Sequence, residues 1–142
     1  MSGLRRECVI VPVDFSAESY KAFDTALGIV DSPAKVHVVH VLADLAPLEA
    51  GEVWGLPDMT VRLERAKQLL VQELARGVAG GMSVDVVVGD PAHAITDFAS
   101  EKKADLIVIP SHGRTGLTRL LIGSTAERVV RLAHCPVLVL RS

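Results

Sequence analysis

Aromatic residues, cysteines and net charge are all scarce in this chain of 142 residues. Aromatic side chains make up 4% of the residues although 49% are hydrophobic, so a core must be built from Val, Leu, Ile and Ala. A formal net charge of −2 leaves no broad basic field, which argues against nucleic acid or an anionic membrane as a partner. Cys8 and Cys135 form no metal-binding or redox pattern, and we expect two free thiols.

Long hydrophobic runs are also missing. The apolar stretch from Cys8 to Val13 is broken at once by Asp14, and it is too short for a signal peptide or a membrane span. We therefore expect a cytoplasmic protein with no membrane-spanning segment. The length is typical of one domain, so residues 1–142 are predicted to form a single domain with its own core.

Five short apolar runs rich in β-branched residues recur along the chain and predict strands buried on both faces. Segments with the apolar spacing of helices lie between them. The predicted strands are Cys8 to Pro12, Lys35 to Leu42, Val84 to Val88, Asp105 to Ile109 and Val137 to Leu140. The helical stripes are Ala22, Phe23, Ala26, Leu27 and Val30; Leu63, Ala66, Leu70 and Leu74, closed by Gly80-Gly81; Ala92, Ile95, Phe98 and Ala99; and Ala126, Val129, Val130 and Ala133.

This alternation of strands and helices predicts an α/β fold, a doubly wound five-stranded parallel sheet joined by right-handed crossovers. Such a sheet has a switch point, where successive connections leave in opposite directions and open a crevice at the carboxyl ends of the strands. Ligands bind in a crevice of this kind. We expect it to be flanked by Pro12 to Ser16, after the first strand, and by Pro110 to Gly113, after the fourth.

The glycine-rich segment from Pro110 to Thr125 carries the strongest chemical signal. Gly113 and Gly116 allow positive φ and close approach, so backbone amides there can line an anion-binding concavity. Residues 123–125 open the last predicted helix, where free N–H groups and the helix dipole favour an anion. Both halves of the segment indicate phosphate binding.

The same part of the chain also allows structural roles. Ser124 or Thr125 could N-cap the last helix, with Glu127 completing a capping box, and this role is compatible with phosphate binding. Asp14 could accept from a ribose hydroxyl or help to hold Mg²⁺, or it could N-cap the first helix together with Ser16. The residues alone leave both roles open.

No catalytic pair is predicted. Ser111 and His112 are adjacent, so in an extended segment their side chains should point to opposite sides and not form a nucleophile and base. His112 could donate to a phosphate or hold the loop, and Arg114 and Arg119 could add charge to the phosphate site or stay solvated. The remaining histidines show no metal-ligand spacing and are expected to be structural or exposed: His37, His40, His93 and His134.

Several stretches resemble the universal stress protein family. They are Val11 to Ser16 (VPVDFS), the pair His40-Val41, Gly113 followed after nine residues by Gly123-Ser124, and Cys135 to Val139 (CPVLV). The resemblance covers essentially the whole chain. It implies an adenine nucleotide alpha hydrolase-like fold with strand order 3-2-1-4-5.

Family members with this type of loop bind ATP through a motif of Gly, two residues, Gly, nine residues, and Gly followed by Ser or Thr. The resemblance implies phosphate contacts from Gly113, Gly123 and Ser124, and contacts to adenosine from the ends of the first two strands. The candidate cofactor-binding residues are Pro12, Val13, Asp14, Val41, Pro110, Gly113, Arg114, Gly123, Ser124 and Thr125.

Pro110 stands where the motif has its first glycine. It fixes φ and removes an N–H, so a backbone donor or a close ribose contact would be lost there. We expect binding of ATP, with or without Mg²⁺, and at most slow hydrolysis, because no general base can be named. The alternative is a stress protein without nucleotide that acts through protein contacts, for which the loop from Asp44 to Asp58, with Trp54, is a candidate surface.

The last predicted strand, Val137 to Leu140, would form an unprotected sheet edge that invites pairing with another chain. The resemblance implies a homodimer through this edge, and the alternative is an edge covered by another element of the same chain. In the implied strand order Cys8 and Cys135 lie two strands apart, about 9.6 Å. A disulfide needs Cα atoms within about 7 Å, so these two should not pair.

Two other classes of protein fit less well. A phospho-accepting receiver domain would use Asp90 after the third strand, but it needs an acidic pair after the first strand, where Asp14 stands alone. An enzyme that activates substrates with ATP on a related fold would need a Ser-Gly-Gly-x-Asp loop or a His-x-Gly-His motif. The sequence has neither.

Overall fold

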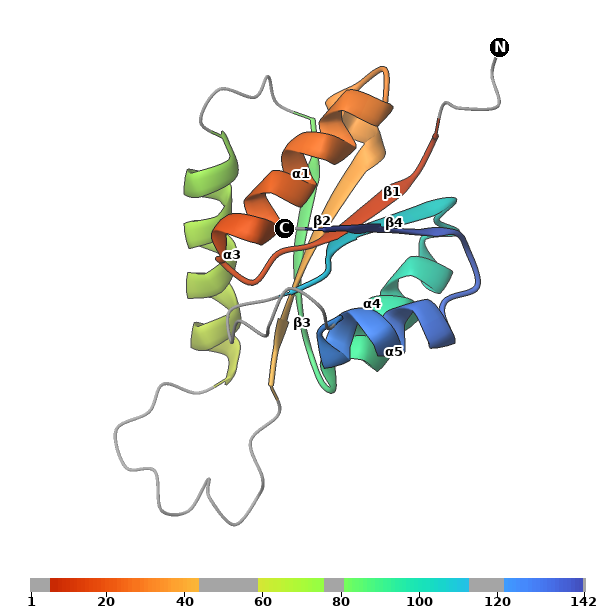
Figure 1. The fold of residues 1–142 in the computed structure, drawn as a ribbon. Helices are drawn as coiled ribbons and strands as arrows, with labels where there is room; N and C mark the ends of the chain where they lie inside the picture. The colour runs from red at the N-terminus through yellow and green to blue at the C-terminus, as the bar shows by residue number, and fades with distance from the viewer. Residues whose placement is uncertain (1–5, 44–58, 76–80, 113–121, 142) are drawn as a thin grey trace.

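The computed structural model describes residues 6–43, 59–75, 81–112 and 122–141, which form a parallel sheet covered by helices (Figure 1). Hydrogen bonds join the strands in the order β3-β2-β1-β4-β5, and every neighbouring pair is parallel. The predicted fold class and strand order are confirmed. The strands are β1 (Val9–Pro12), β2 (Val36–Leu42), β3 (Ser83–Val88), β4 (Leu106–Pro110) and β5 (Val137–Leu140).

Each predicted helical stripe forms a helix. The helices are α1 (Ala17–Ile29), α3 (Met59–Ala75), α4 (Pro91–Glu101) and α5 (Ser124–Leu132), and a short 3₁₀ helix, η2 (Pro33–Lys35), leads into β2. The predicted closure of the second helix at Gly80-Gly81 falls partly in residues 76–80, outside the described residues. The loop from Asp44 to Asp58 also lies outside them.

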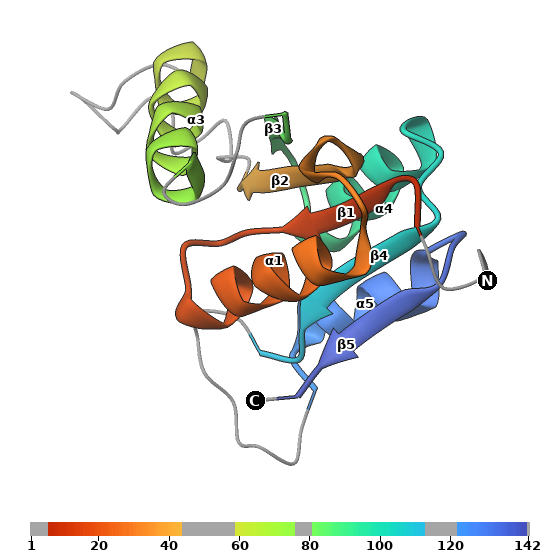
Figure 2. The same ribbon diagram turned by 90° about the horizontal axis from the view of Figure 1, so that it is seen from above.

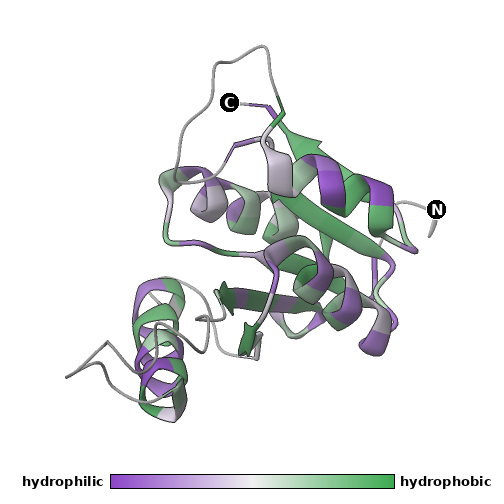
Figure 3. Cartoon of the chain, turned by 90° about the horizontal axis from the view of Figure 1, so that it is seen from below, coloured by the Kyte–Doolittle hydropathy of each residue, from purple (hydrophilic) through white to green (hydrophobic). Residues whose placement is uncertain are grey.

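The sheet separates two apolar cores. On one face α1 and α3 pack against the sheet, with Phe23 and Leu70 among the buried residues, and on the other face α4 and α5 do so, with Ile95 and Val129 (Figure 2). β1, β4 and β5 are apolar along their length and β2 and β3 include a few polar residues, whereas the helices carry polar residues on their outer sides (Figure 3). The central strands β1 and β4 show the pattern expected of parallel strands that are buried on both faces.

Parts of the predicted core lie outside it. The edge strands β3 and β5 were predicted to be buried on both faces but are only partly buried, with Val88 and Leu138 each 37% exposed, because each edge strand has a neighbour on one side only. Val130 was predicted to belong to the apolar stripe of α5, but 51% of its surface is exposed. Val129, its neighbour in the chain, is fully buried against the sheet. A helix buries only the stripe that faces the sheet, and consecutive residues point about 100° apart.

The predicted thiols are confirmed: Cys8 and Cys135 are free and half-buried. They precede β1 and β5, and β4 lies between those two strands. Burial raises the pKa of both thiols, and the negative charge of Asp105 adds to the shift. Among the described residues, no helix is long and apolar enough to cross a membrane.

Candidate functional site

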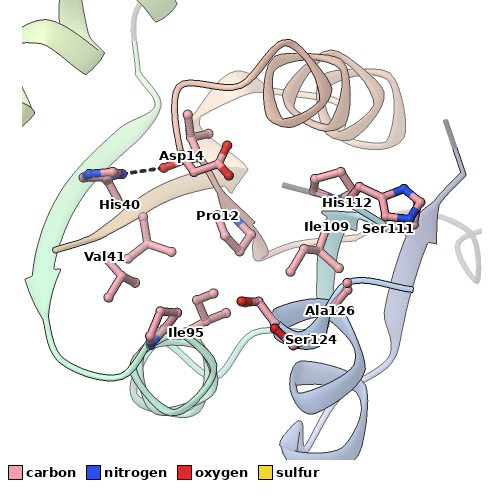
Figure 4. Close-up of a pocket in the computed structure, with 16 residues that line it drawn as sticks. Pro12, Asp14, His40, Val41, Ile95, Ile109, Ser111, His112, Ser124 and Ala126 are labelled. Carbon is pink, nitrogen blue, oxygen red and sulfur yellow. Dashed lines mark hydrogen bonds between the residues drawn. The ribbon is translucent and has the colours of Figure 1, made fainter. Parts of the chain in front are cut away.

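A cavity of about 280 Å³ opens at the carboxyl ends of β1, β2 and β4, where β1 and β4 diverge. This is the switch point at which the sequence predicts a ligand. Figure 4 shows the side chains around it, with Asp14 and Ser124 on opposite sides. The described lining residues are Pro12, Val13, Asp14, Val39, His40, Val41, Pro91, Ile95, Ile109, Pro110, Ser111, His112, Gly123, Ser124, Thr125 and Ala126.

Most of the candidate residues named from the sequence line this one cavity. Two candidates, Gly113 and Arg114, lie outside the described residues, as do Gly116 and Arg119. The candidates that the structure brings together are Pro12, Val13, Asp14, Val41, Pro110, Gly123, Ser124 and Thr125. They come from the ends of β1, β2 and β4 and from the start of α5.

Asp14 braces the turn between β1 and α1. Ser16 is the N-cap of α1, because its hydroxyl accepts from the N–H of Ser19 at 3.1 Å. The carboxylate oxygen Oδ1 of Asp14 accepts from the N–H of Ser16 at 3.0 Å and also from its hydroxyl. Ser16 therefore caps the helix itself, and Asp14 holds the cap in place while its side chain lines the cavity.

His40 has a structural role, one of the two outcomes expected for it: it is buried and holds the end of β1 beside the cavity. Its Nδ1 lies 2.7 Å from the carbonyl oxygen of Val13, and since a carbonyl only accepts, Nδ1 carries the proton. The ring of Phe15 packs edge-on against His40, with the ring centres 4.8 Å apart. Phe15 has a φ of 66°, which is uncommon for an aromatic residue. The contact with His40 helps to keep the backbone in this conformation.

Pro110 ends β4 without removing a hydrogen bond that the sheet uses. The N–H groups of Ile107 and Ser111 both donate to carbonyls on the β5 side. Backbone N–H groups alternate along a strand, so the nitrogen of Pro110 faces the β1 side. The pairing of β1 with β4 has already stopped at Ile10 and Ile107. The buried proline ring instead lines the cavity.

The start of α5 differs from the sequence prediction. Gly123 is the N-cap of α5, and no side-chain hydrogen bond from the N-cap residue closes the helix. The predicted role of Ser124 or Thr125 as N-cap, with Glu127 completing a capping box, was therefore wrong. The helix begins one residue earlier than that cap requires, because Gly123 is tied to the end of β4. Its N–H donates to the carbonyl oxygen of Ser111 at 2.7 Å, and a Cβ would lie 3.0 Å from that oxygen.

This early start leaves a donor-rich helix end at the cavity. The amide N–H groups of the first helical turn have no intrahelical acceptor. Residues 124–126 form that turn, and all three line the cavity. The N–H of Gly123 is already used, so the donors available to a ligand begin at Ser124.

The expectation that Ser111 and His112 point apart was wrong. Both side chains are buried beside the cavity, and the Oγ of Ser111 lies 3.2 Å from the Nδ1 of His112. The alternation of side chains holds only within a regular strand, and these two residues follow the end of β4. Figure 4 shows them side by side at one end of the cavity.

The rest of the described cavity wall includes apolar residues that belong to no binding motif in the sequence. Ile95 of α4, Ile109 of β4 and Ala126 of α5 are each buried and line the cavity. Their apolar spacing predicted burial, but it gave no sign that they border a cavity rather than the core. The described lining therefore combines an apolar wall with a few polar groups, which is typical of small-molecule sites.

A charged cluster lies beside the cavity, where α4 and α5 begin. Asp90 N-caps α4 by accepting from the N–H of His93 at 3.2 Å, and Arg128 of α5 donates to both of its carboxylate oxygens at 3.0 Å. The Nδ1 of His93 lies 2.8 Å from Oδ2 of Asp90. The hydrogen bonds from Arg128, and then those from His93, hold the pKa of Asp90 well below its ordinary value.

Comparison with known proteins identifies the class. A sequence model of the universal stress protein family matches residues 6–141, and this chain belongs to that family. Universal stress protein MJ0531 of Methanocaldococcus jannaschii is 38% identical over 138 residues, which cover 94% of this chain and 81% of that protein.

Solved structures agree with this assignment. Universal stress protein UspA from Lactobacillus plantarum has a TM-score of 0.75 at 28% identity and covers 96% of this chain and 99% of its own. A universal stress protein solved in complex with cAMP has the same fold, with a TM-score of 0.61 at 24% identity over 96% of this chain and 99% of its own.

Proposed function

We propose that this universal stress protein binds an adenine nucleotide, ATP in the first place, in the cavity at the switch point and serves as a nucleotide-responsive regulator in the stress response. The observation that carries the proposal is the start of α5. Its first turn, residues 124–126, lines the cavity, and its N-cap, Gly123, has no side chain that competes for its amides. Such a helix end attracts phosphate through its N–H groups and its dipole.

The opposite end of the cavity suits a nucleoside. Val41 and Ile95 supply an apolar wall for the flat face of a base, and Asp14 places a carboxylate where a ribose hydroxyl can donate to it. We infer that the base lies against the end of β2 and that the phosphates extend toward α5. Pro12 and Val13 complete the nucleoside end from β1.

The charge of the phosphates needs a counter-ion. The described residues that line the cavity include no Lys or Arg, and Asp14 is their one carboxylate. We propose that Mg²⁺ binds with the nucleotide and is held mainly by its phosphate oxygens, because Asp14 lies at the nucleoside end. Gly113 and Arg114 are proposed as further phosphate contacts. Hydrolysis is expected to be slow at most.

Pro110 favours one other candidate, a stress protein that binds no nucleotide and acts through protein contacts. Its buried ring occupies part of the cavity wall where the family motif has a glycine. If that ring excludes the nucleotide, replacing it by glycine restores binding. The effect of Pro110→Gly therefore separates the two candidates.

Isothermal titration calorimetry tests the proposal with ATP and MgCl₂. We expect the native protein to bind one ATP per chain and Pro110→Gly to bind it at least as well. Asp14→Asn should weaken binding about tenfold, because a hydrogen bond to a charged group is lost while the turn that Asp14 braces keeps an acceptor. Competition with cAMP shows whether the site requires the triphosphate.

The matched control is Asp97→Asn, which removes one carboxylate from the exposed face of α4. It should leave the affinity unchanged. A native protein that binds neither ATP nor cAMP, together with a Pro110→Gly variant that does, would establish the second candidate instead.

A further inference from the structure

The ion pair between Asp90 and Arg128 joins the two helices whose first residues line the cavity. Asp90 is the N-cap of α4, and the next residue, Pro91, lines the cavity. Arg128 follows Ser124 by four residues, about one helical turn, on α5. Neither charged residue belongs to the lining itself, so the pair can set the position of the lining residues only through the helices that it connects.

The pair has the geometry of a rigid connection. Nη1 and Nη2 of Arg128 each lie 3.0 Å from a different carboxylate oxygen of Asp90. A planar guanidinium that donates two parallel hydrogen bonds fixes orientation as well as distance, which a single contact cannot do. Two contacts then hold the start of α5. Arg128 of α5 binds Asp90 at the start of α4, and the N–H of Gly123 donates to Ser111 at the end of β4.

We propose that Asp90 and Arg128 are positioning residues for the phosphate end of the bound nucleotide. Their bidentate pair sets the position of the first turn of α5 relative to α4, and so directs the amides of residues 124–126 into the cavity. The proposal rests on the proposed nucleotide binding and extends it to a specific pair outside the cavity. It predicts that the pair matters for phosphate and not for the nucleoside.

For the variant Asp90→Asn, a purely electrostatic effect and the positioning role predict opposite changes in ATP affinity. Asp90→Asn removes a negative charge near the phosphate end, so the field by itself would strengthen ATP binding. Loss of the bidentate pair would instead weaken it. Asparagine caps a helix about as well as aspartate, so the start of α4 is preserved in this variant.

The experiment compares ATP with adenosine for the native protein, Asp90→Asn, Arg128→Gln and the double variant. We expect the Kd for ATP to rise about three- to tenfold in Asp90→Asn and the Kd for adenosine to change by less than about twofold. The double variant should lose no more affinity than the larger single loss, because the two residues act as one unit.

Glu127→Gln is the charge-matched control. Like Asp90→Asn, it removes one carboxylate near the phosphate end, here from the start of α5. It also breaks the ion pair in which Nη2 of Arg131 lies 2.6 Å from Oε1 of Glu127. That pair lies within one helix and connects nothing across the cavity. The Kd for ATP should not rise in this variant.

Amide hydrogen exchange of the ligand-free protein gives a readout that does not depend on nucleotide. Exchange in the second turn of α5, which starts with the hydrogen-bonded N–H of Glu127, should be faster in Asp90→Asn than in Glu127→Gln. Equal exchange in the two variants, or an unchanged ratio of ATP to adenosine affinity, overturns the positioning role while nucleotide binding stands. Absence of ATP binding by the native protein overturns the proposed function and, with it, this inference.

Discussion

The N–H of Gly123 donates to the carbonyl oxygen of Ser111 at 2.7 Å, and this bond ties the start of α5 to the end of β4. A Cβ at position 123 would lie 3.0 Å from the same oxygen. The backbone conformation at Gly123 is ordinary, with φ −60° and ψ 152°, so glycine is needed here for the close approach. The family glycine therefore has a packing role in addition to any role toward phosphate.

Gly123→Ala should destabilise the fold by about 1 to 3 kcal/mol, because backbone atoms must shift to admit the methyl group. Urea denaturation measures the free energy of unfolding. The control is Gly28→Ala within α1, where nothing lies within 4 Å of the added Cβ. That variant should be more stable by about 0.5 to 1 kcal/mol, since alanine is the better helix former. Equal effects of the two changes would contradict the packing role.

Lys103→Gly should stabilise the protein by about 0.5 to 1 kcal/mol. Lys103 follows α4 with a φ of 56°, and its N–H and that of Ala104 donate to carbonyls of Ser100 and Ala99, the pattern of a Schellman cap. Thermal unfolding detects the gain. The adjacent Lys102→Gly, at a right-handed helical position, should instead lower stability. A loss of stability in Lys103→Gly would show that the side chain makes contacts that outweigh the strain.

The stability of the native protein should fall in acid partly through Asp90. Arg128 and then His93 lower the pKa of Asp90 in the folded state, so the unfolded chain takes up its proton first as the pH falls. The contribution of this carboxylate begins to fall near pH 4, the ordinary pKa range of the unfolded chain, and is lost progressively as the pH approaches the lower pKa of the folded state. The difference in unfolding free energy between native protein and Asp90→Asn should therefore shrink from pH 6 to pH 3, about the window of carboxylate titration. A constant difference across that range would contradict the assigned pairing.

We expect a homodimer through β5, one of the two edges of the sheet. Leu138 on this strand is 37% exposed and borders a groove lined by Ile29, Val30 and Leu106. Leu138→Glu should shift the protein to monomer in sedimentation velocity, because a charge would be buried in the interface. Val61→Glu on α3, where the native side chain is 40% exposed, is the matched control and should remain dimeric. A monomeric native protein would exclude the proposed interface.

The fold was predictable because the signals for strands are local. Parallel strands are short continuous runs of apolar residues, so β5 was predicted with its exact limits and β1 within one residue, although β5 is an edge strand and only partly buried. The exposure of Val130 was not predictable in the same way. Hydrophobic spacing identifies the apolar side of a helix, but how wide a stripe is covered depends on what packs against it.

The lining of the candidate site was predictable only where a motif marks it. Asp14 and Ser124 follow from the family pattern, and the structure places both at one cavity. The bond from His40 to Val13 and the ion pair of Asp90 with Arg128 join residues far apart in the sequence, and no spacing rule points to them. Such contacts depend on tertiary packing, which the sequence pattern does not specify.

The most direct test of the account is an NMR titration of the ¹⁵N-labelled native protein with ATP and MgCl₂, which reports on each backbone amide. The account predicts the largest shifts at Ser124, Thr125 and Ala126, whose N–H groups receive the phosphates, with further shifts at Asp14 and Val41 at the nucleoside end. An unchanged spectrum at saturating ATP, or shifts confined to residues away from this cavity, would contradict it.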